Sequence, residues 1–172
     1  GEKRLHELLR ELCKVEGIRW IRLLYCYPEE ITDELIDVIR TEPKICHYLD
    51  MPIQHSSDAI LRRMGRRTSR SELETVIGKL RKAIPDITLR TTLITGFPGE
   101  TEEDHEDLKS FVRKMEFDRL GVFTYSPEEG TPAEKMAGQV PEELKENRRD
   151  ELMLLQQQVS AKKTAAMIGK TV

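Results

Sequence analysis

The sequence predicts an α/β fold in which short parallel strands alternate with helices. Four β-branched or aromatic segments are spaced along the 172 residues, and each is separated from the next by a helical pattern. Connections long enough to hold a helix join parallel strands through right-handed crossovers. Periodicity leaves open whether the sheet is flat or curls as part of a barrel. A complete eight-stranded barrel needs about 250 residues, so this chain is too short for one.

The first part of the chain begins with a helix. Leucines on one face of residues 5–12 predict this helix, and residues 18–25 (IRWIRLLY) are typical of a strand. Thr32 is expected to cap a second helix, which ends before Pro43 because proline disfavours a helical residue in front of it. Residues 46–53 (CHYLDMPI) form the second extended segment.

Two helices are expected between the second and third strands. The first runs through Met64 and stops at Gly65. A Ser-x-x-Glu capping box at Ser71 and Glu74 predicts the start of the second, which Pro85 terminates.

The second half of the chain continues the alternation. Strands are expected at residues 87–95 (ITLRTTLIT) and 120–125 (LGVFTY). Thr101 caps the helix between them, whose first turn is acidic as the helix dipole favours. A long helix begins at Pro141.

Charge and hydropathy limit the class of protein. The chain has 28 Lys and Arg against 31 Asp and Glu, a net charge of −3 that argues against a sequence-wide basic field for nucleic acid. No apolar run approaches the ~18 residues that a membrane span requires. These features predict a soluble cytoplasmic protein that has no membrane partner.

The three cysteines predict no metal site. Cys13, Cys26 and Cys46 lie too far apart to form a CxxC or CxxxC clip, so sequence neighbours cannot hold zinc or an iron–sulfur cluster. Free thiols in a reducing compartment are expected.

Polar residues follow each predicted strand, where ligands bind in parallel α/β folds. Gln54 and His55 can hydrogen-bond hydroxyls such as those of a ribose, although Ser56 and Ser57 can equally cap a helix. The turn at residues 96–100 (GFPGE) lacks the lysine of a phosphate loop and has an acidic flank, so phosphate binding is not expected.

Three charged features have two interpretations each. Arg90 lies in the middle of a predicted strand, where it either anchors a ligand or is an arginine at the edge of the sheet. The basic cluster between residues 62 and 70 compensates a helix C-terminus or contacts RNA or another anionic partner. Acidic residues that include Glu128 and Glu129 receive a basic polypeptide or form a solvated loop.

Longer motifs carry a family resemblance over nearly the whole chain. They are WIRLLYCYP (20–28), LDMPIQHSSDAILRRMGRR (49–67), LRTTLITGFPGETEED (89–104) and FDRLGVFTYSPEEGTPA (117–133). Together they resemble the radical S-adenosylmethionine methylthiotransferases. PIQHSSD with YSPEEGTPA resembles the RimO type, which acts on an aspartate of ribosomal protein S-twelve, more than the tRNA-modifying MiaB type.

The resemblance implies a partial (β/α) barrel of radical S-adenosylmethionine type with six parallel strands. This chain would contribute about four βα units, the third to sixth strands, and a long C-terminal helix. Residues 1–163 would belong to the partial core domain. Residues 164–172 would begin a linker into a TRAM domain that the chain does not contain.

The family's cofactors are S-adenosylmethionine and [4Fe–4S] clusters. The CxxxCxxC loop that holds the radical cluster in the family is absent here, and no cysteine of the chain matches a cluster ligand. No cluster is therefore expected in this chain, the isolated chain is predicted to be inactive, and no catalytic or metal-ligating residue is assigned.

Residue roles transfer only where the motifs match. Residues expected to contact S-adenosylmethionine are Gln54, His55, Ser56, Arg90, Thr92, Ile94, Gly96, Phe123, Thr124 and Tyr125. Glu128 and Glu129 are expected to contact the substrate protein. The arginines that could contact RNA are Arg62, Arg63, Arg66, Arg67 and Arg70.

Two other functions and one risk of self-association stay open. The chain could belong to a tRNA methylthiotransferase of the MiaB type, or to a non-catalytic fragment that binds RNA or protein. A missing neighbour strand would leave residues 18–25 at a sheet edge, where dimerisation is a hazard.

Overall fold

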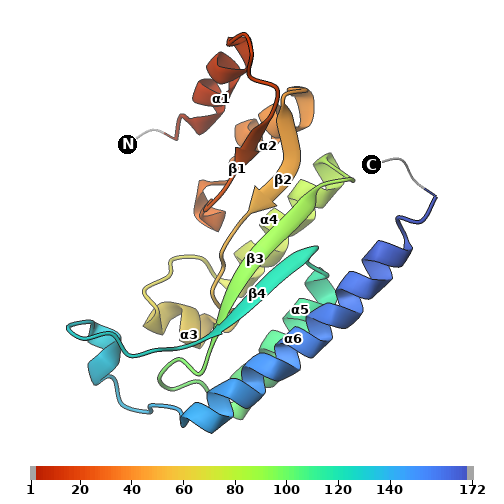
Figure 1. Ribbon diagram of the computed structural model, residues 1–172. Coiled ribbons are helices and arrows are strands. Elements are labelled where there is room, and N and C mark those ends of the chain that lie inside the picture. Colours follow the sequence, from red (N-terminus) through yellow and green to blue (C-terminus); the bar gives the residue numbers. More distant parts are fainter. Residues whose placement is uncertain (1–2, 170–172) are drawn as a thin grey trace.

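Four parallel strands form one sheet in the computed structural model, which describes residues 3–169. Their spatial order β1-β2-β3-β4 follows the chain, as repeated βα units require (Figure 1). The predicted α/β class with parallel strands is confirmed. The strands are β1 (Ile21–Leu23), β2 (Ile45–Asp50), β3 (Thr88–Thr95) and β4 (Arg119–Thr124).

Helices cover one face of this sheet, with α6 running alongside α5 and β4 (Figure 1). The helices are α1 (Leu5–Lys14), α2 (Asp33–Thr41), α3 (Asp58–Arg63), α4 (Arg70–Ala83), α5 (Glu102–Met115) and α6 (Glu142–Ala165), with short 3-10 turns η1 (Pro28–Glu30) and η2 (Pro132–Lys135). No helix within residues 3–169 is long and apolar enough to cross a membrane.

Burial alternates strictly along β3. Leu89 and Leu93 are buried on the helix-covered face, whereas Arg90, Thr92 and Ile94 on the other face keep part of their surface exposed. A parallel strand covered on both faces has a near-continuous apolar sequence instead. The second face of the sheet is therefore only partly covered.

The first two strands are shorter than predicted. β1 covers only Ile21–Leu23 of the expected residues 18–25, because it is an edge strand whose register with β2 shifts between its two ends. β2 ends at Asp50, before Pro52, which has no N–H for the ladder. The chain rejoins the sheet at Gln54 through an isolated bridge to Leu93.

Most predicted helix starts are confirmed, with one exception. Thr32 accepts a hydrogen bond from the Leu35 N–H, and Thr101 forms a capping box with Asp104. The box predicted at Ser71 and Glu74 is wrong. A second Ser-x-x-Glu sequence, two residues earlier, supplies the cap instead.

Ser69 and Glu72 form the capping box of α4. This choice places Ser71 inside the first turn and leaves Glu74 free to pair with Arg70 and Lys114. The two Ser-x-x-Glu sequences give the same local signal for a helix start. The ion pairs of Glu74 with Arg70 in α4 and with Lys114 in α5 cannot be read from that signal.

The C-terminal helix extends beyond the expected domain boundary at residue 163. α6 ends at Ala165, and a turn follows. The last part of the expected linker, residues 170–172, lies outside the described residues, so the boundary stays a prediction.

The position of the α4 cap can be tested by removing each serine hydroxyl. We expect Ser69→Ala to lower the free energy of unfolding by about 1 kcal/mol, because the N–H groups of the first turn lose their acceptor. Ser71→Ala is the matched control and should change it by less than about 0.5 kcal/mol, since alanine is favoured within a helix. Urea denaturation of the three proteins measures the difference, and an equal loss in both variants would contradict the assignment.

Candidate functional site

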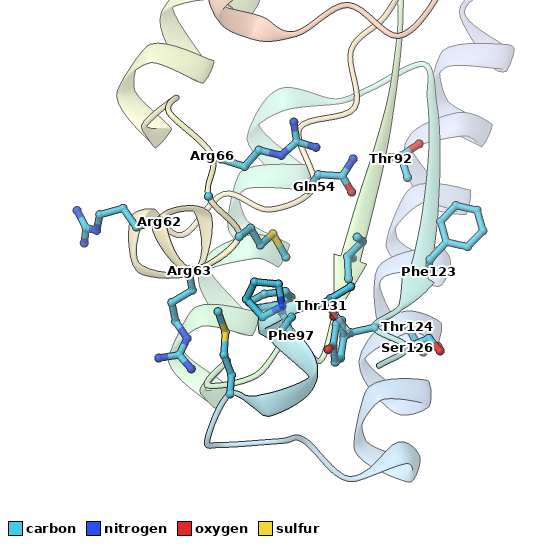
Figure 2. Close-up of a pocket in the computed structure, with 17 residues that line it drawn as sticks. Gln54, Arg62, Arg63, Arg66, Thr92, Phe97, Phe123, Thr124, Ser126 and Thr131 are labelled. Atoms are coloured by element: carbon cyan, nitrogen blue, oxygen red, sulfur yellow. The ribbon is translucent and has the colours of Figure 1, made fainter. Parts of the chain in front are cut away.

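A cavity of about 800 Å³ lies at the carboxyl ends of β3 and β4 on the partly covered face of the sheet (Figure 2). This volume is typical of sites for drug-sized ligands and nucleoside cofactors. Its walls come from the two strands, the segment at Gln54, the C-terminal end of α3 and the loop around η2. This is the edge where ligands bind in parallel α/β folds.

Six of the ten residues predicted to contact the cofactor line this cavity. Figure 2 shows Gln54, Thr92, Phe123 and Thr124 from three separate chain segments around it. The full set is Gln54, Thr92, Ile94, Phe123, Thr124 and Tyr125. Their contact with a cofactor stays a prediction, but the structure brings them together.

Gln54 has an unusual backbone conformation. Its φ of 72° lies in the left-handed region, which non-glycine residues rarely adopt. Two hydrogen bonds to β3 hold it there: its N–H donates to the Thr92 carbonyl at 3.0 Å, and its carbonyl accepts from the Ile94 N–H at 2.8 Å. Strain of this kind costs of order 1–3 kcal/mol and persists only where surrounding contacts hold the residue in place.

An apolar cluster forms the floor of the cavity. The rings of Phe97 and Tyr125 meet edge to face, with centroids 5.2 Å apart, and both pack with Ile60. Ile94 and Met136 pack against this cluster. A floor of this composition suits a planar, weakly polar ring.

His55 and Ser56 do not line the cavity. The His55 ring is fully buried, and its Nδ1 accepts from the Ser57 N–H at 2.9 Å. Its Nε2 lies 3.6 Å from Glu100 Oε2. The Ser56 hydroxyl is also buried and makes no hydrogen bond within residues 3–169. In this structure both residues belong to the packing beneath the cavity.

Gly96 lies beside the cavity with its backbone already engaged. Its N–H donates to Glu100 Oε2 at 2.7 Å. Its φ of 70° favours glycine, and any Cβ there would collide with the side chain of Lys145. The backbone N–H of Gly96, one of the residues expected to contact the cofactor, is therefore not free for a ligand in this conformation.

Glu100 connects the turn after β3 to the C-terminal helix. Besides the bond from Gly96, its carboxylate accepts from Arg148 Nη1 at 2.9 Å, and its carbonyl accepts from the same atom at 3.2 Å. Both side chains are almost fully buried. Removal of Glu100 would leave Arg148 with only the largely exposed Glu102 as a partner, and removal of Arg148 would leave the buried Glu100 carboxylate without its guanidinium.

Arg90 is paired and does not line the cavity. Its Nη1 lies 2.9 Å from Oδ1 of Asp50, and the two residues are register partners on β3 and β2. Because β3 is an interior strand, the interpretation of Arg90 as a sheet-edge arginine is wrong. The ion pair offsets the cost of placing a guanidinium among apolar residues.

The basic cluster does not form one surface. Arg63 Nε donates to the Pro98 carbonyl at 2.8 Å, and Arg70 pairs with Glu74 and Asp107. RNA binding through the whole cluster stays a prediction, with two of its members already committed to internal contacts.

Arg66 also lines the cavity, although the sequence indicated only a possible RNA contact for it. Its guanidinium lies 5.2 Å from the centroid of the Tyr27 ring, a cation–π contact. Among residues 3–169 it makes no ion pair and no side-chain hydrogen bond. Gly65, with a φ of 71°, ends α3 and turns the chain back toward the strand ends, and it is the sequence signal that could have placed Arg66 here.

The predicted substrate residues Glu128 and Glu129 lie outside the cavity, on the exposed loop that follows β4. Their neighbours Ser126 and Thr131 do line it. The loop therefore forms one rim of the cavity, and its acidic residues face solvent.

The described residues do not fit an iron–sulfur cluster. Residues 3–169 contain no group of three His, Cys, Asp or Glu side chains that could hold a metal ion. Burial raises the pKa of the Cys26 thiol, and the nearby Asp50 carboxylate raises it further. Burial also raises the pKa of the Cys13 thiol. Cluster ligands are thiolates, so both shifts oppose this role.

Comparison with known proteins agrees with this geometry. The family model of the radical SAM superfamily matches residues 2–112. The chain is 65% identical over 170 residues to the ribosomal protein uS12 methylthiotransferase RimO of Lachnoclostridium phytofermentans and 57% identical over 171 residues to that of Clostridium botulinum strain Hall. These matches cover 99% of this chain but only 39% and 38% of the two relatives.

A solved structure shows the same fold. Coproporphyrinogen III oxidase from Escherichia coli, described as a radical SAM enzyme, superposes with a TM-score of 0.70 over 92% of this chain and 38% of its own. The identity of 23% limits this likeness to the fold.

Substitution of Glu100 tests its role beneath the cavity. We expect Glu100→Ala to destabilise the fold by about 3–5 kcal/mol, because Arg148 then loses its buried partner and keeps only an exposed one. Glu102→Ala is the matched control: its carboxylate also contacts Arg148, at 3.1 Å, but is largely exposed, so the loss should be at most about 1 kcal/mol. Urea denaturation measures the free energy of unfolding of both variants. Similar losses would show that the buried Glu100–Arg148 pair stabilises the fold no more than the exposed Glu102 contact does.

Proposed function

Since the chain belongs to the radical SAM superfamily, we propose that it forms part of the catalytic core of a methylthiotransferase. The reaction would add a methylthio group to the β-carbon of an aspartate in ribosomal protein uS12. The function in the names of both relatives supports this substrate over tRNA. The protein would act in the cytoplasm, with residues 1–163 in the core and residues 164–172 leading toward a TRAM domain.

The cavity is the observation that carries this proposal. Its volume of about 800 Å³, its aromatic floor and its few polar groups fit an adenosine. Gln54 and Thr92 offer hydrogen bonds to ribose hydroxyls, and Phe97 with Tyr125 lies where a planar base can pack. S-adenosylmethionine, when bound, supplies the oxidising power that removes a hydrogen atom from the substrate carbon.

Arg66 would bind the carboxylate of the methionine portion of the cofactor. It is a guanidinium without an ion pair among the described residues, in the wall of a mostly apolar cavity, and Tyr27 restrains it. A planar guanidinium binds a carboxylate through two parallel hydrogen bonds. The Tyr27 ring limits the side-chain entropy lost on binding.

The iron–sulfur cluster would be held by parts of the protein beyond this chain. The relatives are more than twice as long as the matched region, and the cysteines described above do not fit the ligand role. The chain's own residues would then bind and orient the cofactor and exclude water, and the electron donor would come from elsewhere.

Anaerobic reconstitution tests the separation of cofactor pocket and cluster. We expect the 172-residue chain, incubated with iron and sulfide, to bind well below the four irons of a [4Fe–4S] cluster, because its three cysteines lie far apart in the sequence with no CxxC or CxxxC spacing. Iron analysis and the absorbance of sulfur-to-iron transitions provide the measurement, with the full-length protein as the positive control. About four irons per chain would refute the proposal.

Arg66→Ala tests the assignment of the cofactor carboxylate. In the reconstituted full-length enzyme we expect the Kd for S-adenosylmethionine to rise about thirtyfold, because a charge-assisted hydrogen bond is lost. Arg67→Ala is the control, since Arg67 is not among the residues that line the cavity. Equilibrium dialysis measures the Kd, and equal affinities of the two variants would exclude Arg66 from the site.

A further inference from the structure

The outer edge of β4 is a regular strand edge with unused backbone groups. β4 pairs with β3 over six consecutive residues without a register shift, and among residues 3–169 it has no strand on its other side. The opposite edge of the sheet, β1, has three residues and an irregular register. Long, regular edges are the ones that accept an additional strand.

The hydrogen-bonding pattern identifies which groups of β4 point outward. The Tyr125 N–H donates to the Thr95 carbonyl at 2.8 Å, and Thr95 is the register partner of Thr124. Peptide groups alternate in direction along a strand, so Gly121 and Phe123 also face β3. The N–H and C=O groups of Leu120, Val122 and Thr124 therefore face the open edge.

Helix α6 does not use these outward groups. Gln156 donates to the Phe117 carbonyl at 2.8 Å, just before the strand, and Lys145 donates to the Tyr125 carbonyl at 2.9 Å, just after it. Within residues 3–169, no side chain bonds to the backbone of Leu120, Val122 or Thr124. The helix anchors both ends of β4 and leaves its central edge unpaired.

This edge is continuous with the cavity. Phe123 and Thr124, at its carboxyl end, line the cavity, and the Phe123 side chain is 61% exposed on the partly covered face. At Gly121 an added Cβ would meet nothing closer than the Phe123 ring at 3.9 Å. Every second side chain of a strand laid along β4 would point onto this partly covered face, and one at the level of Phe123 would reach the cavity.

Charge at the carboxyl end of the edge favours a basic polypeptide. The chain leaves β4 through Tyr125 and reaches the exposed Glu128 and Glu129. Ribosomal proteins neutralise RNA phosphates with lysine and arginine, so a segment of one carries the complementary charge.

We propose that the polypeptide substrate docks as an added strand on the outer edge of β4, with its target side chain in the cavity beside Phe123 and its basic flank against Glu128 and Glu129. This inference rests on the proposed function. Backbone hydrogen bonds would supply much of the affinity, and the cavity would select the residue that reacts.

Backbone methylation of the substrate tests the docking mode. The probe is a synthetic peptide of about ten residues centred on the aspartate of uS12, assayed with the reconstituted full-length enzyme. An N-methyl group at each position in turn should lower kcat/KM about tenfold at alternate residues and leave the residues between them unchanged. If side chains alone were recognised, the loss of kcat/KM would not alternate from one methylated position to the next. A loss that is uniform or irregular along the peptide would overturn the proposal.

Two further measurements report on the enzyme itself. Peptide binding should slow amide hydrogen exchange at Leu120, Val122 and Thr124 and leave Gly121 and Phe123, already bonded to β3, unchanged. Slow exchange at the first three before peptide is added would mean that another segment or a second copy covers the edge, and would refute the proposal.

The charge contribution is tested by reversal. E128K/E129K should raise the KM for the peptide about tenfold without changing the Kd for S-adenosylmethionine. E143K/E146K, which reverses two exposed acids on α6, is the control. An equal effect in both would remove the acidic loop from the docking surface. If the enzyme with its cofactors does not modify intact uS12 at all, the proposed function fails; normal modification with a flat methylation profile overturns the docking mode alone.

Discussion

The buried ion pair between Glu100 and Arg148 holds the turn after β3 against the C-terminal helix. The same carboxylate accepts the Gly96 N–H, so one side chain fixes both ends of this turn. Phe97 lies within the turn and forms half of the cavity floor with Tyr125. The position of the floor therefore depends on a charge pair that a solvent-exposed contact could not replace, because exposed pairs contribute little and are screened.

The second constraint is the one-sided sheet. The helices bury Leu89 and Leu93, and the alternation of side chains along β3 then places Thr92 and Ile94 on the other face. The strained Gln54 extends this face beyond the end of β2. The cavity follows from this arrangement, because the polar and partly exposed groups share one surface.

Short sequence motifs predicted the helix caps well, but they predicted poorly which strands pair in the sheet. Thr32 and Thr101 cap their helices as expected, since a cap is decided within four residues. Ser69 rather than Ser71 caps α4, because two identical signals compete and contacts with distant residues distinguish them. The short β1 and the interior position of β3, which excludes a sheet-edge Arg90, depend on neighbouring strands that periodicity does not identify.

The α/β class, the parallel strands and the family resemblance can be read from the amino-acid sequence alone, because they follow from short-range patterns and contiguous motifs. It also indicated six residues that line the cavity. Only the tertiary structure separated these from the buried His55, Ser56 and Gly96, and only it placed Arg66 in the cavity wall. The physical reason is that the direction of a side chain relative to a cavity depends on packing between elements distant in the chain.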